Sequence, residues 1–146
     1  MNEKSFQNNF MKYGKPLNYY RIALINGTGF PDILGIHGPS HSLIELKYLV
    51  LGKRGDKKIR PLFKDSQIPW YLNYFMNGGT RLFAAFQIHD WDESNKKYGL
   101  WQLRKQDVLN MDDIRYSDLK EGIFLYTEYS SCKDMIEQIS SLPEAR

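Results

Sequence analysis

Runs of apolar residues, unbroken or alternating with polar ones, predict six β-strands along the chain. They are rich in Val, Ile, Leu, Phe and Tyr, the side chains that pack well in sheets. The run from Leu82 to Ile88 is apolar on both faces, so it predicts a strand in the middle of a sheet. The predicted strands cover residues 19–25, 32–36, 42–51, 80–88, 98–103 and 123–129.

Apolar residues at helical spacing predict helices before, between and after these strands. Phe6 and Phe10 mark one buried side of the first helix, and the Gly-Lys-Pro segment that follows ends it. Asp65 or Ser66 can cap the second helix. The predicted helices cover residues 3–13, 66–76 and 106–111, with a further helix that starts at a capping Ser131.

Three charged residues interrupt segments that otherwise have the pattern of buried strands. Asp32 opens one strand, and Glu45 and Lys47 lie within the next. Charged side chains are rarely buried unless they are paired, protonated or bound to a metal. Because side chains alternate between the faces of a strand, Glu45 and Lys47 project to the same side. If the two strands pair as a hairpin, Asp32 joins them at one edge of the sheet.

The ordered motifs that begin at these residues resemble the PD-(D/E)XK nuclease superfamily. Gly29-Phe30-Pro31-Asp32 supplies the Pro-Asp pair, and Glu45-Leu46-Lys47 supplies Glu-x-Lys. Ser66-Gln67-Ile68-Pro69-Trp70 and Asn77-Gly78-Gly79 are similar to the Ser-Gln, aromatic-helix and Gly-Gly segment of small phage and VRR-NUC-type members. The resemblance covers about residues 3–88. Pro-Asp and Glu-x-Lys are common alone, whereas the whole series is much more specific.

The resemblance implies an α/β fold with a restriction-endonuclease-like core. A central mixed β-sheet would be flanked by helices in the order αβββαβ over about residues 3–88. Residues 89–146 would add a C-terminal strand–helix extension, in which the sequence shows no identifiable chemistry. A length of 146 residues suits one domain with one core, so residues 1–146 are expected to fold as a single unit.

The resemblance also implies metal-dependent hydrolysis of phosphodiester bonds in DNA. Asp32, Glu45 and the backbone carbonyl of Leu46 would bind Mg²⁺ or Mn²⁺, hard cations that prefer oxygen ligands. Lys47, charged beside two carboxylates, suits stabilisation of negative charge better than action as a base. Gln67 would join the active site and hydrogen-bond the attacking water or the scissile phosphate.

Charged residues outside this set are candidates for the metal or for nucleic acid. Family members often carry an acidic residue on the first helix. Glu3 is the acidic residue available there, with stabilisation of the helix end as the alternative. The net charge of +3 permits an anionic partner. Arg21 faces either phosphate or water. A basic loop follows the Glu-x-Lys strand and is expected to contact phosphates; its cations are Lys53, Arg54, Lys57, Lys58, Arg60 and Lys64.

Several other classes of function are disfavoured by composition and spacing. The single Cys132 excludes an intrachain disulfide and favours an intracellular, cytoplasmic protein, a virus-encoded one included. No apolar run is long enough to span a membrane. His37 and His41 are separated by Gly and Pro, which argues against a helical zinc site. Asn26-Gly27-Thr28-Gly29 is a turn that lacks the third glycine of a dinucleotide-binding loop.

The sequence leaves more than one function open. The leading interpretation is an endonuclease, with branched DNA such as a Holliday junction as a substrate that family resemblance alone suggests. A resolvase of this kind would need a homodimer. The alternatives are a non-catalytic nucleic-acid-binding or inhibitory protein on the same fold, and an exonuclease or nickase. Without catalysis, Lys47 would simply pair with Glu45, and Asp32 would only start a strand.

Overall fold

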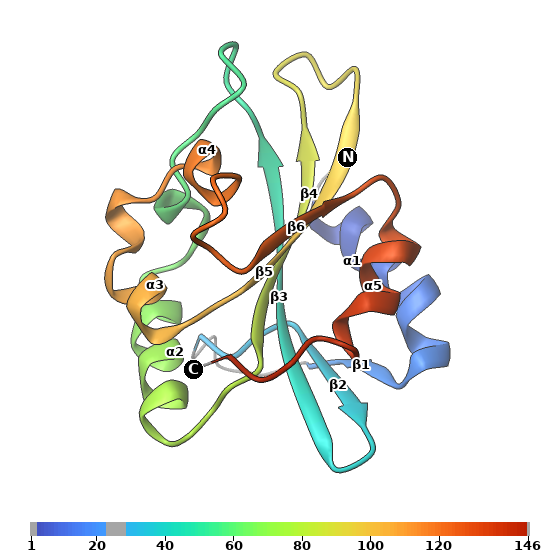
Figure 1. Cartoon of the computed structure of the whole chain (residues 1–146). Coiled ribbons are helices and arrows are strands. Elements are labelled where there is room, and N and C mark those ends of the chain that lie inside the picture. The colour runs from blue at the N-terminus through green and yellow to red at the C-terminus, as the bar shows by residue number, and fades with distance from the viewer. Residues whose placement is uncertain (1–2, 23–28, 146) are drawn as a thin grey trace.

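The computed structural model describes residues 3–22 and 29–145 as alternating helices and strands (Figure 1). The strands are β1 (Tyr19–Arg21), β2 (Ile33–His37), β3 (Ser40–Val50), β4 (Leu82–His89), β5 (Lys96–Gln102) and β6 (Tyr126–Tyr129). The α-helices are α1 (Glu3–Gly14), α2 (Gln67–Met76), α3 (Lys105–Leu109), α4 (Tyr116–Leu119) and α5 (Cys132–Ile139). Short 3₁₀ helices are η1 (Lys15–Leu17), η2 (Arg60–Leu62) and η3 (Met111–Asp113).

The strands form one six-stranded mixed sheet in the order β1-β2-β3-β4-β5-β6. β3 and β4 are parallel, and each of the other neighbouring pairs among these strands is antiparallel. A parallel pair needs a crossover connection, and here the segment with η2 and α2 provides it. The predicted fold class, a mixed sheet flanked by helices in the order αβββαβ, is confirmed.

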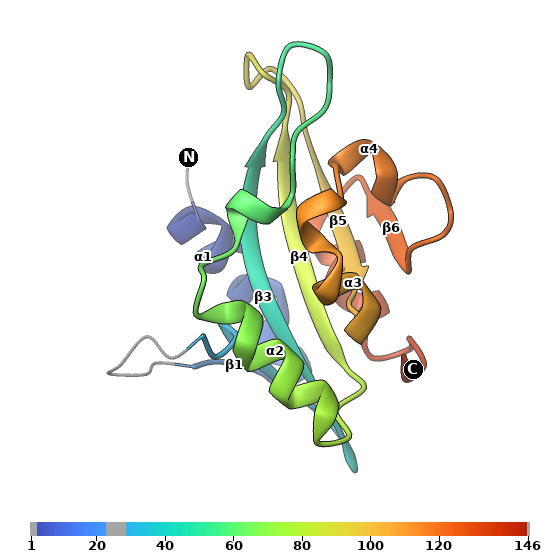
Figure 2. The ribbon, with the colours of Figure 1, turned by 90° about the vertical axis from the view of Figure 1, so that its left-hand side faces the viewer.

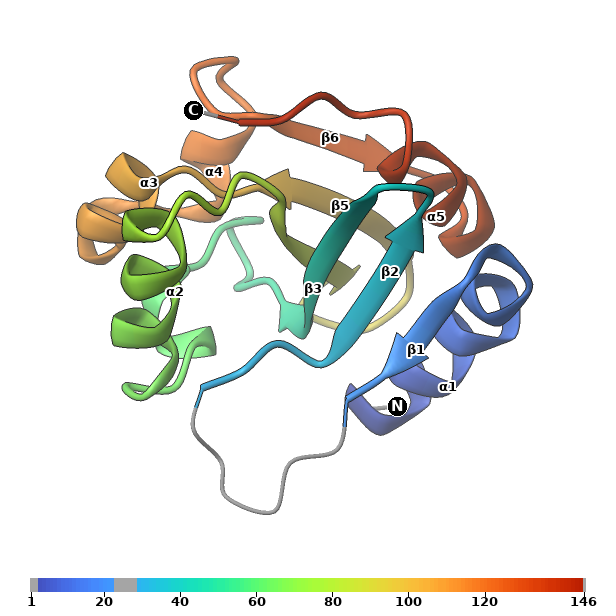
Figure 3. The same cartoon turned by 90° about the horizontal axis from the view of Figure 1, so that it is seen from below.

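Helices cover both faces of the sheet. α1 and α5 lie side by side on one face, and α2, α3 and α4 lie on the other (Figures 2 and 3). β4 is central, and all eight of its residues are buried, as the apolar run predicts. Within residues 3–22 and 29–145, each helix is too short or too polar to cross a membrane.

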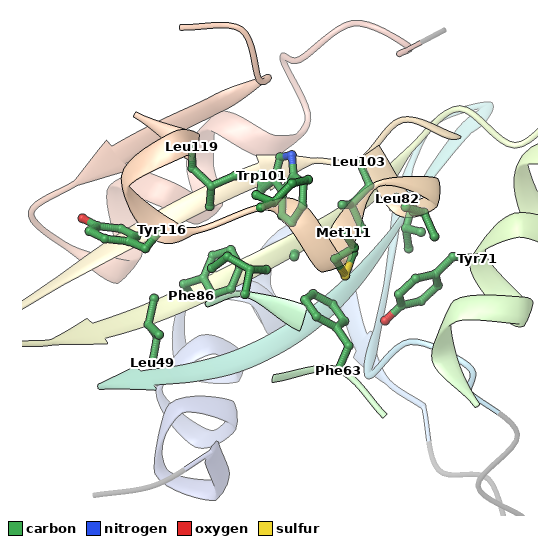
Figure 4. Close-up of a cluster of buried hydrophobic side chains, with 14 of the residues drawn as sticks. Leu49, Phe63, Tyr71, Leu82, Phe86, Trp101, Leu103, Met111, Tyr116 and Leu119 are labelled. Atoms are coloured by element: carbon green, nitrogen blue, oxygen red, sulfur yellow. The ribbon is translucent and has the colours of Figure 1, made fainter. Parts of the chain in front are cut away.

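Each face of the sheet has its own hydrophobic core. On the α2 face, Tyr71 of α2 packs with Phe63, Leu49, Phe86 and other buried side chains (Figure 4). On the opposite face, side chains of α1 and α5 pack against alternate residues of β3 and β4; they include Phe6, Phe10, Met135, Ile136, Ile44, Leu46, Phe83 and Ala85. Glu45 and Lys47 alternate with Ile44 and Leu46, so the pleat places them on the α2 face.

The apolar pattern overestimates the last strand and omits some short helices. The prediction of a strand over 123–129 is wrong at its start, because β6 begins at Tyr126 and Ile123 is 68% exposed. The predicted cap of α2 is also wrong: Ser66 makes no side-chain capping bond, and Lys64 supplies the backbone acceptor for Gln67 N–H. α4 was not predicted, since four residues carry little periodic signal. Residues 23–28, within the predicted strand 19–25 and the predicted turn, lie outside the described residues.

Candidate active site

Strand register places the predicted carboxylates next to one another. β2 and β3 form the expected antiparallel hairpin, in which Ile33 pairs with Ile44. The residue before Ile33 is Asp32, which therefore lies beside Glu45 at the point where β2 begins. Glu45 and Lys47 point to the α2 face, and both are 3% exposed. The hairpin thus brings Asp32, Glu45 and Lys47 together as the alternation of side chains indicates.

Gln67, in the first turn of α2, connects the carboxylate and the ammonium. Its Nε2 donates to Glu45 Oε1 at 2.8 Å. Its Oε1 accepts from Lys47 Nζ at 3.1 Å and from the Lys64 backbone N–H at 2.9 Å. Lys47 Nζ also lies 3.5 Å from Glu45 Oε1 and 4.9 Å from the centroid of the Phe63 ring. The orientation of the Gln67 amide is therefore fixed by two donors on one side and one acceptor on the other.

Asp32 is held by the backbone of β3. Its Oδ2 accepts a hydrogen bond of 2.8 Å from Leu46 N–H. The N–H and C=O of one strand residue point to the same side, so the Leu46 carbonyl also faces this edge. β2 pairs with β3 only from Ile33 onward, and no β2 strand residue stands opposite Leu46 in the described register. An oxygen from Leu46 is thus available beside the Asp32 carboxylate.

A cleft of about 280 Å³ opens onto this group of side chains. Asp32, Glu45, Lys47 and Gln67 all line it. Glu3, from the first turn of α1, lines the same cleft together with Lys64, although these residues come from distant parts of the sequence. All four residues predicted to be catalytic, and the candidate Glu3, therefore meet at one cavity.

The electrostatics of the cleft are dominated by two neighbouring carboxylates. Burial, and next the negative charge of Asp32, raise the pKa of Glu45 to about 8, although Lys47 and Gln67 oppose the shift. A carboxylate pair of this kind holds a proton in the absence of another cation. The site is therefore short of positive charge even with Lys47 present.

The donor set fits a hard divalent cation. Asp32, Glu45 and the Leu46 carbonyl offer oxygen atoms, the ligand type that Mg²⁺ and Mn²⁺ prefer. Among residues 3–22 and 29–145, no group of three or more His, Cys, Asp or Glu side chains is close enough to hold a metal. Glu3 lines the cleft without completing such a group. The geometry fits a site with two carboxylates and one carbonyl, in which water would complete the coordination.

The sequence did not reveal Tyr71 as part of this site. Tyr71 lies one helical turn after Gln67, is fully buried, and donates from its hydroxyl to Glu45 Oε2 at 3.3 Å. Gln67 and Tyr71 thus contact the two oxygens of the same carboxylate. Their spacing of four residues on one face of α2 is the sequence signal that could have pointed to Tyr71.

Gly29 allows the Asp32 segment to pack against the start of α2. Its φ is +87°, and a Cβ added there would lie 2.2 Å from the Ser66 carbonyl oxygen. Next to it, the Phe30 ring packs edge-on against Trp70, with 4.7 Å between ring centroids. The glycine of the Gly-x-Pro-Asp motif therefore lets the segment before β2, which carries Asp32, pack against the start of the helix that carries Gln67.

Replacing Gly29 by Ala is expected to lower the free energy of unfolding more than the same change at Gly55. Both glycines have positive φ, which costs an L-residue about 1–2 kcal/mol. A Cβ at Gly55 meets nothing within 4 Å, whereas one at Gly29 overlaps backbone atoms, which adds about 1–3 kcal/mol. Urea denaturation of the two variants measures the difference. Equal losses would show that the packing of Gly29 on α2 is not tight.

The predicted nucleic-acid-binding residues are spread along the molecule. Lys64 lines the cleft. Arg60 is half-buried, and it donates to the Phe63 carbonyl and to the exposed Asp65 carboxylate. Arg21 donates to Asn8 Oδ1. The remaining cations of the basic loop lie beyond the end of β3, away from the cleft; they are Lys53, Arg54, Lys57 and Lys58.

Similarity to known proteins is found at the level of structure. No protein family model matches the sequence, and no curated protein matches it. The structure is similar to that of Archaeoglobus fulgidus Hjc, described as a Holliday junction resolvase from an archaeal hyperthermophile. The sequence identity is 12%, the TM-score is 0.39, and the match covers 65% of this chain and 74% of that chain. None of these comparisons assigns a role to a residue of the cleft.

Proposed function

We propose that this protein is a metal-dependent nuclease that hydrolyses phosphodiester bonds in DNA. One observation carries the proposal: Asp32, Glu45, Lys47 and Gln67, from β3, α2 and the segment that precedes β2, converge on one cleft. Burying two neighbouring carboxylates and a lysine costs free energy of folding. A protein that keeps such a group therefore has a functional reason for it. A surface ion pair would need neither the burial nor the cleft.

The residues of the cleft have distinct tasks in this proposal. When bound by Asp32, Glu45 and the Leu46 carbonyl, Mg²⁺ or Mn²⁺ would polarise the phosphate and activate water. The Lys47 ammonium offsets the negative charge that develops on the phosphate as the bond breaks. Gln67 orients Lys47 and Glu45, and its amide is positioned to hydrogen-bond the water or the phosphate. Glu3 is proposed as an outer acidic residue at the rim.

The DNA-binding surface is proposed to extend from the cleft along the basic residues. Lys64 lies at the cleft itself, and the loop cations beyond β3 would contact phosphates farther along the strand. Arg60 is engaged by carboxylates, so its contribution would be smaller than the charge count suggests. Arg21, exposed on β1, would be an additional phosphate contact. An endonuclease acting on branched DNA as a homodimer is the form that we propose to test first.

The decisive experiment compares supercoiled plasmid with a synthetic four-way junction, each incubated with Mg²⁺ or Mn²⁺. The wild type should cut with either metal, and Asp32→Ala should not. Cutting of the junction alone would identify branched DNA as the substrate, whereas a single nick in plasmid or degradation from ends would identify a nickase or an exonuclease. Equal cutting by the wild type and Asp32→Ala would indicate contamination. Tight DNA binding without cutting would favour the non-catalytic alternative.

Removing the Tyr71 hydroxyl is expected to weaken metal binding. Tyr71→Phe keeps the ring in the core but frees Glu45 Oε2, and loss of such a supporting hydrogen bond typically costs about tenfold or more in metal affinity. Titration calorimetry with Mn²⁺ in the absence of DNA measures the change directly. Tyr74→Phe is the matched control on α2, because the Tyr74 hydroxyl contacts the Arg81 N–H and His41 instead. Equal Mn²⁺ affinities for the two variants would remove Tyr71 from the site.

A further inference from the structure

Asp56 is the one acidic residue among the cations of loop 52–58, and its carboxylate points inward. Its Oδ2 accepts from Arg115 Nε at 2.8 Å and from Ser117 Oγ at 3.0 Å. Its Oδ1 accepts from the backbone N–H groups of Ser117 and Lys57, both at 2.9 Å. Burial alone would raise the pKa of Asp56, but these hydrogen bonds lower it well below its usual range. The carboxylate is therefore an anchor between two segments far apart in sequence.

Backbone hydrogen bonds reinforce this anchor. Gly52 N–H donates to the Asp56 carbonyl at 2.9 Å, which closes the loop on itself. Tyr116 N–H donates to the Lys57 carbonyl at 2.8 Å, and Lys58 forms an isolated β-bridge with Arg115. The loop is thus fixed both internally and to the segment before α4. The basic loop 52–58, which the sequence alone could equally describe as a solvated loop, therefore has a fixed conformation.

The cations of the loop point to solvent, whereas the Asp56 carboxylate is bonded to Arg115 and Ser117. Lys53, Arg54, Lys57 and Lys58 are exposed. Arg115 joins them, since 45% of its side chain remains exposed while its Nε bonds Asp56. Lys57, Lys58 and Arg115 line one open cavity of about 500 Å³, together with Asp56 and apolar residues at the end of β3. The result is a concave basic surface to which residues from both halves of the chain contribute.

The position of this surface relative to the cleft fits a DNA arm. β3 continues for five residues from Glu45 to Val50, roughly 17 Å at about 3.3 Å per residue. The chain then turns at the far tip and runs back beside the sheet to α2, so the basic residues extend from the tip toward Lys64 (Figure 2). At about 3.4 Å per base pair, roughly 17 Å of duplex corresponds to about five base pairs.

We propose that loop 52–58 and Arg115 form a preorganised surface for the phosphates of a duplex DNA arm, about five base pairs from the bond in the cleft. Asp56 is the positioning residue of this surface: it contacts no DNA and holds the cations in place. The inference rests on the proposed function in one respect, namely that the scissile phosphate lies at Lys47. It adds the register along the arm, Arg115 as a contact, and Asp56 as the residue that holds the cations in place.

The test uses a substitution for which charge and shape predict opposite results. Asp56→Asn removes a negative charge from a basic surface, so electrostatics alone would tighten DNA binding. If Asp56 positions the loop, binding instead weakens by about threefold to tenfold and log Kd depends less steeply on log salt, because fewer phosphates are contacted. Asp113→Asn is the matched control, because it removes the same charge from an exposed residue two positions before Arg115.

Binding is measured by fluorescence anisotropy on duplexes or junctions with arms of about 4 and about 15 base pairs. The Asp56→Asn defect should appear with long arms and vanish with short arms that do not reach the loop. Thermal unfolding checks that Asp56→Asn folds. If it does not, Ser117→Ala takes its place, because this change removes one hydrogen-bond donor to Asp56. Its expected binding defect is smaller. Binding by Asp56→Asn that equals or exceeds that of Asp113→Asn overturns the inference. If the wild type binds long arms but cuts no DNA, the proposed nuclease activity is wrong. The comparison of Asp56→Asn with Asp113→Asn still tests whether the loop surface binds DNA.

Discussion

Replacing Lys47 by Met is expected to reduce DNA cleavage about a hundredfold to a thousandfold, the usual cost of losing one group that stabilises charge in the transition state. Met keeps most of the length and apolar contact of the lysine stem beside Phe63. What is lost is the ammonium that lies 3.5 Å from Glu45 and 3.1 Å from Gln67. Single-turnover cleavage with saturating enzyme measures the loss in the chemical step.

Lys133→Met provides the control for this experiment. Lys133 lies on α5, on the opposite face of the sheet, and its ammonium is 4.0 Å from Glu137. It carries the same charge as Lys47 but contacts no residue of the cleft, so its substitution should leave the cleavage rate unchanged. If both variants cleave at the wild-type rate, Lys47 has no part in the chemistry and the pairing with Glu45 is structural. Melting temperatures of the two variants separate a catalytic loss from unfolding.

Without metal, the protein is expected to lose stability as the pH rises from about 5 to about 8. The folded chain keeps a proton on Glu45 up to a pKa of about 8, because burial and Asp32 disfavour the anion, whereas the unfolded chain releases it near 4.5. The stabilisation is fully present below pH 4.5 and is lost as the pH passes through this window. Linkage gives a slope of up to about 1.4 kcal/mol per pH unit.

Glu45→Gln isolates this contribution. Other groups also make the stability depend on pH, because burial lowers the pKa of His37 and of His89. The difference in unfolding free energy between wild type and Glu45→Gln, measured by urea denaturation from pH 5.5 to 8.5, cancels them. Added Mg²⁺ should flatten the wild-type curve, because a bound cation replaces the proton and stabilises the fold by mass action. Parallel curves for the two metal-free proteins would show that Glu45 is ionised throughout.

The strands and the central charged residues were predictable because a strand has a simple period. Alternation placed Glu45 and Lys47 on one face, and the expected hairpin brought Asp32 to them. Gln67 was predicted differently: its segment resembles the Ser-Gln segment of small PD-(D/E)XK nucleases, and the helix expected from residue 66 puts it in the first turn. The placement of Asp32, Glu45 and Lys47 needs only local geometry and one pairing. The geometric part of these predictions is seen in the structure, whereas the catalytic roles remain predictions.

Contacts between residues far apart in the sequence could not be predicted from the sequence alone. Tyr71 has the pattern of a core aromatic, and its hydroxyl contact with Glu45 depends on how α2 packs over β3. Asp56 appeared only as a lone acid in a basic loop, because its partner Arg115 lies 59 residues away. Ile123 made the predicted strand too long, because the sequence does not distinguish an apolar residue that stays exposed from one that is buried.

The parallel pairing of β3 with β4 has a consequence for the nascent chain. Glu45 and Lys47 leave the ribosome before Gln67, and α2 is held in place only after the crossover closes and β4 docks beside β3. Such non-local closure is slow compared with hairpin formation. Synthesis therefore completes the β2–β3 hairpin while the cleft is still unassembled, and a truncated product that stops before β4 is expected not to cut DNA.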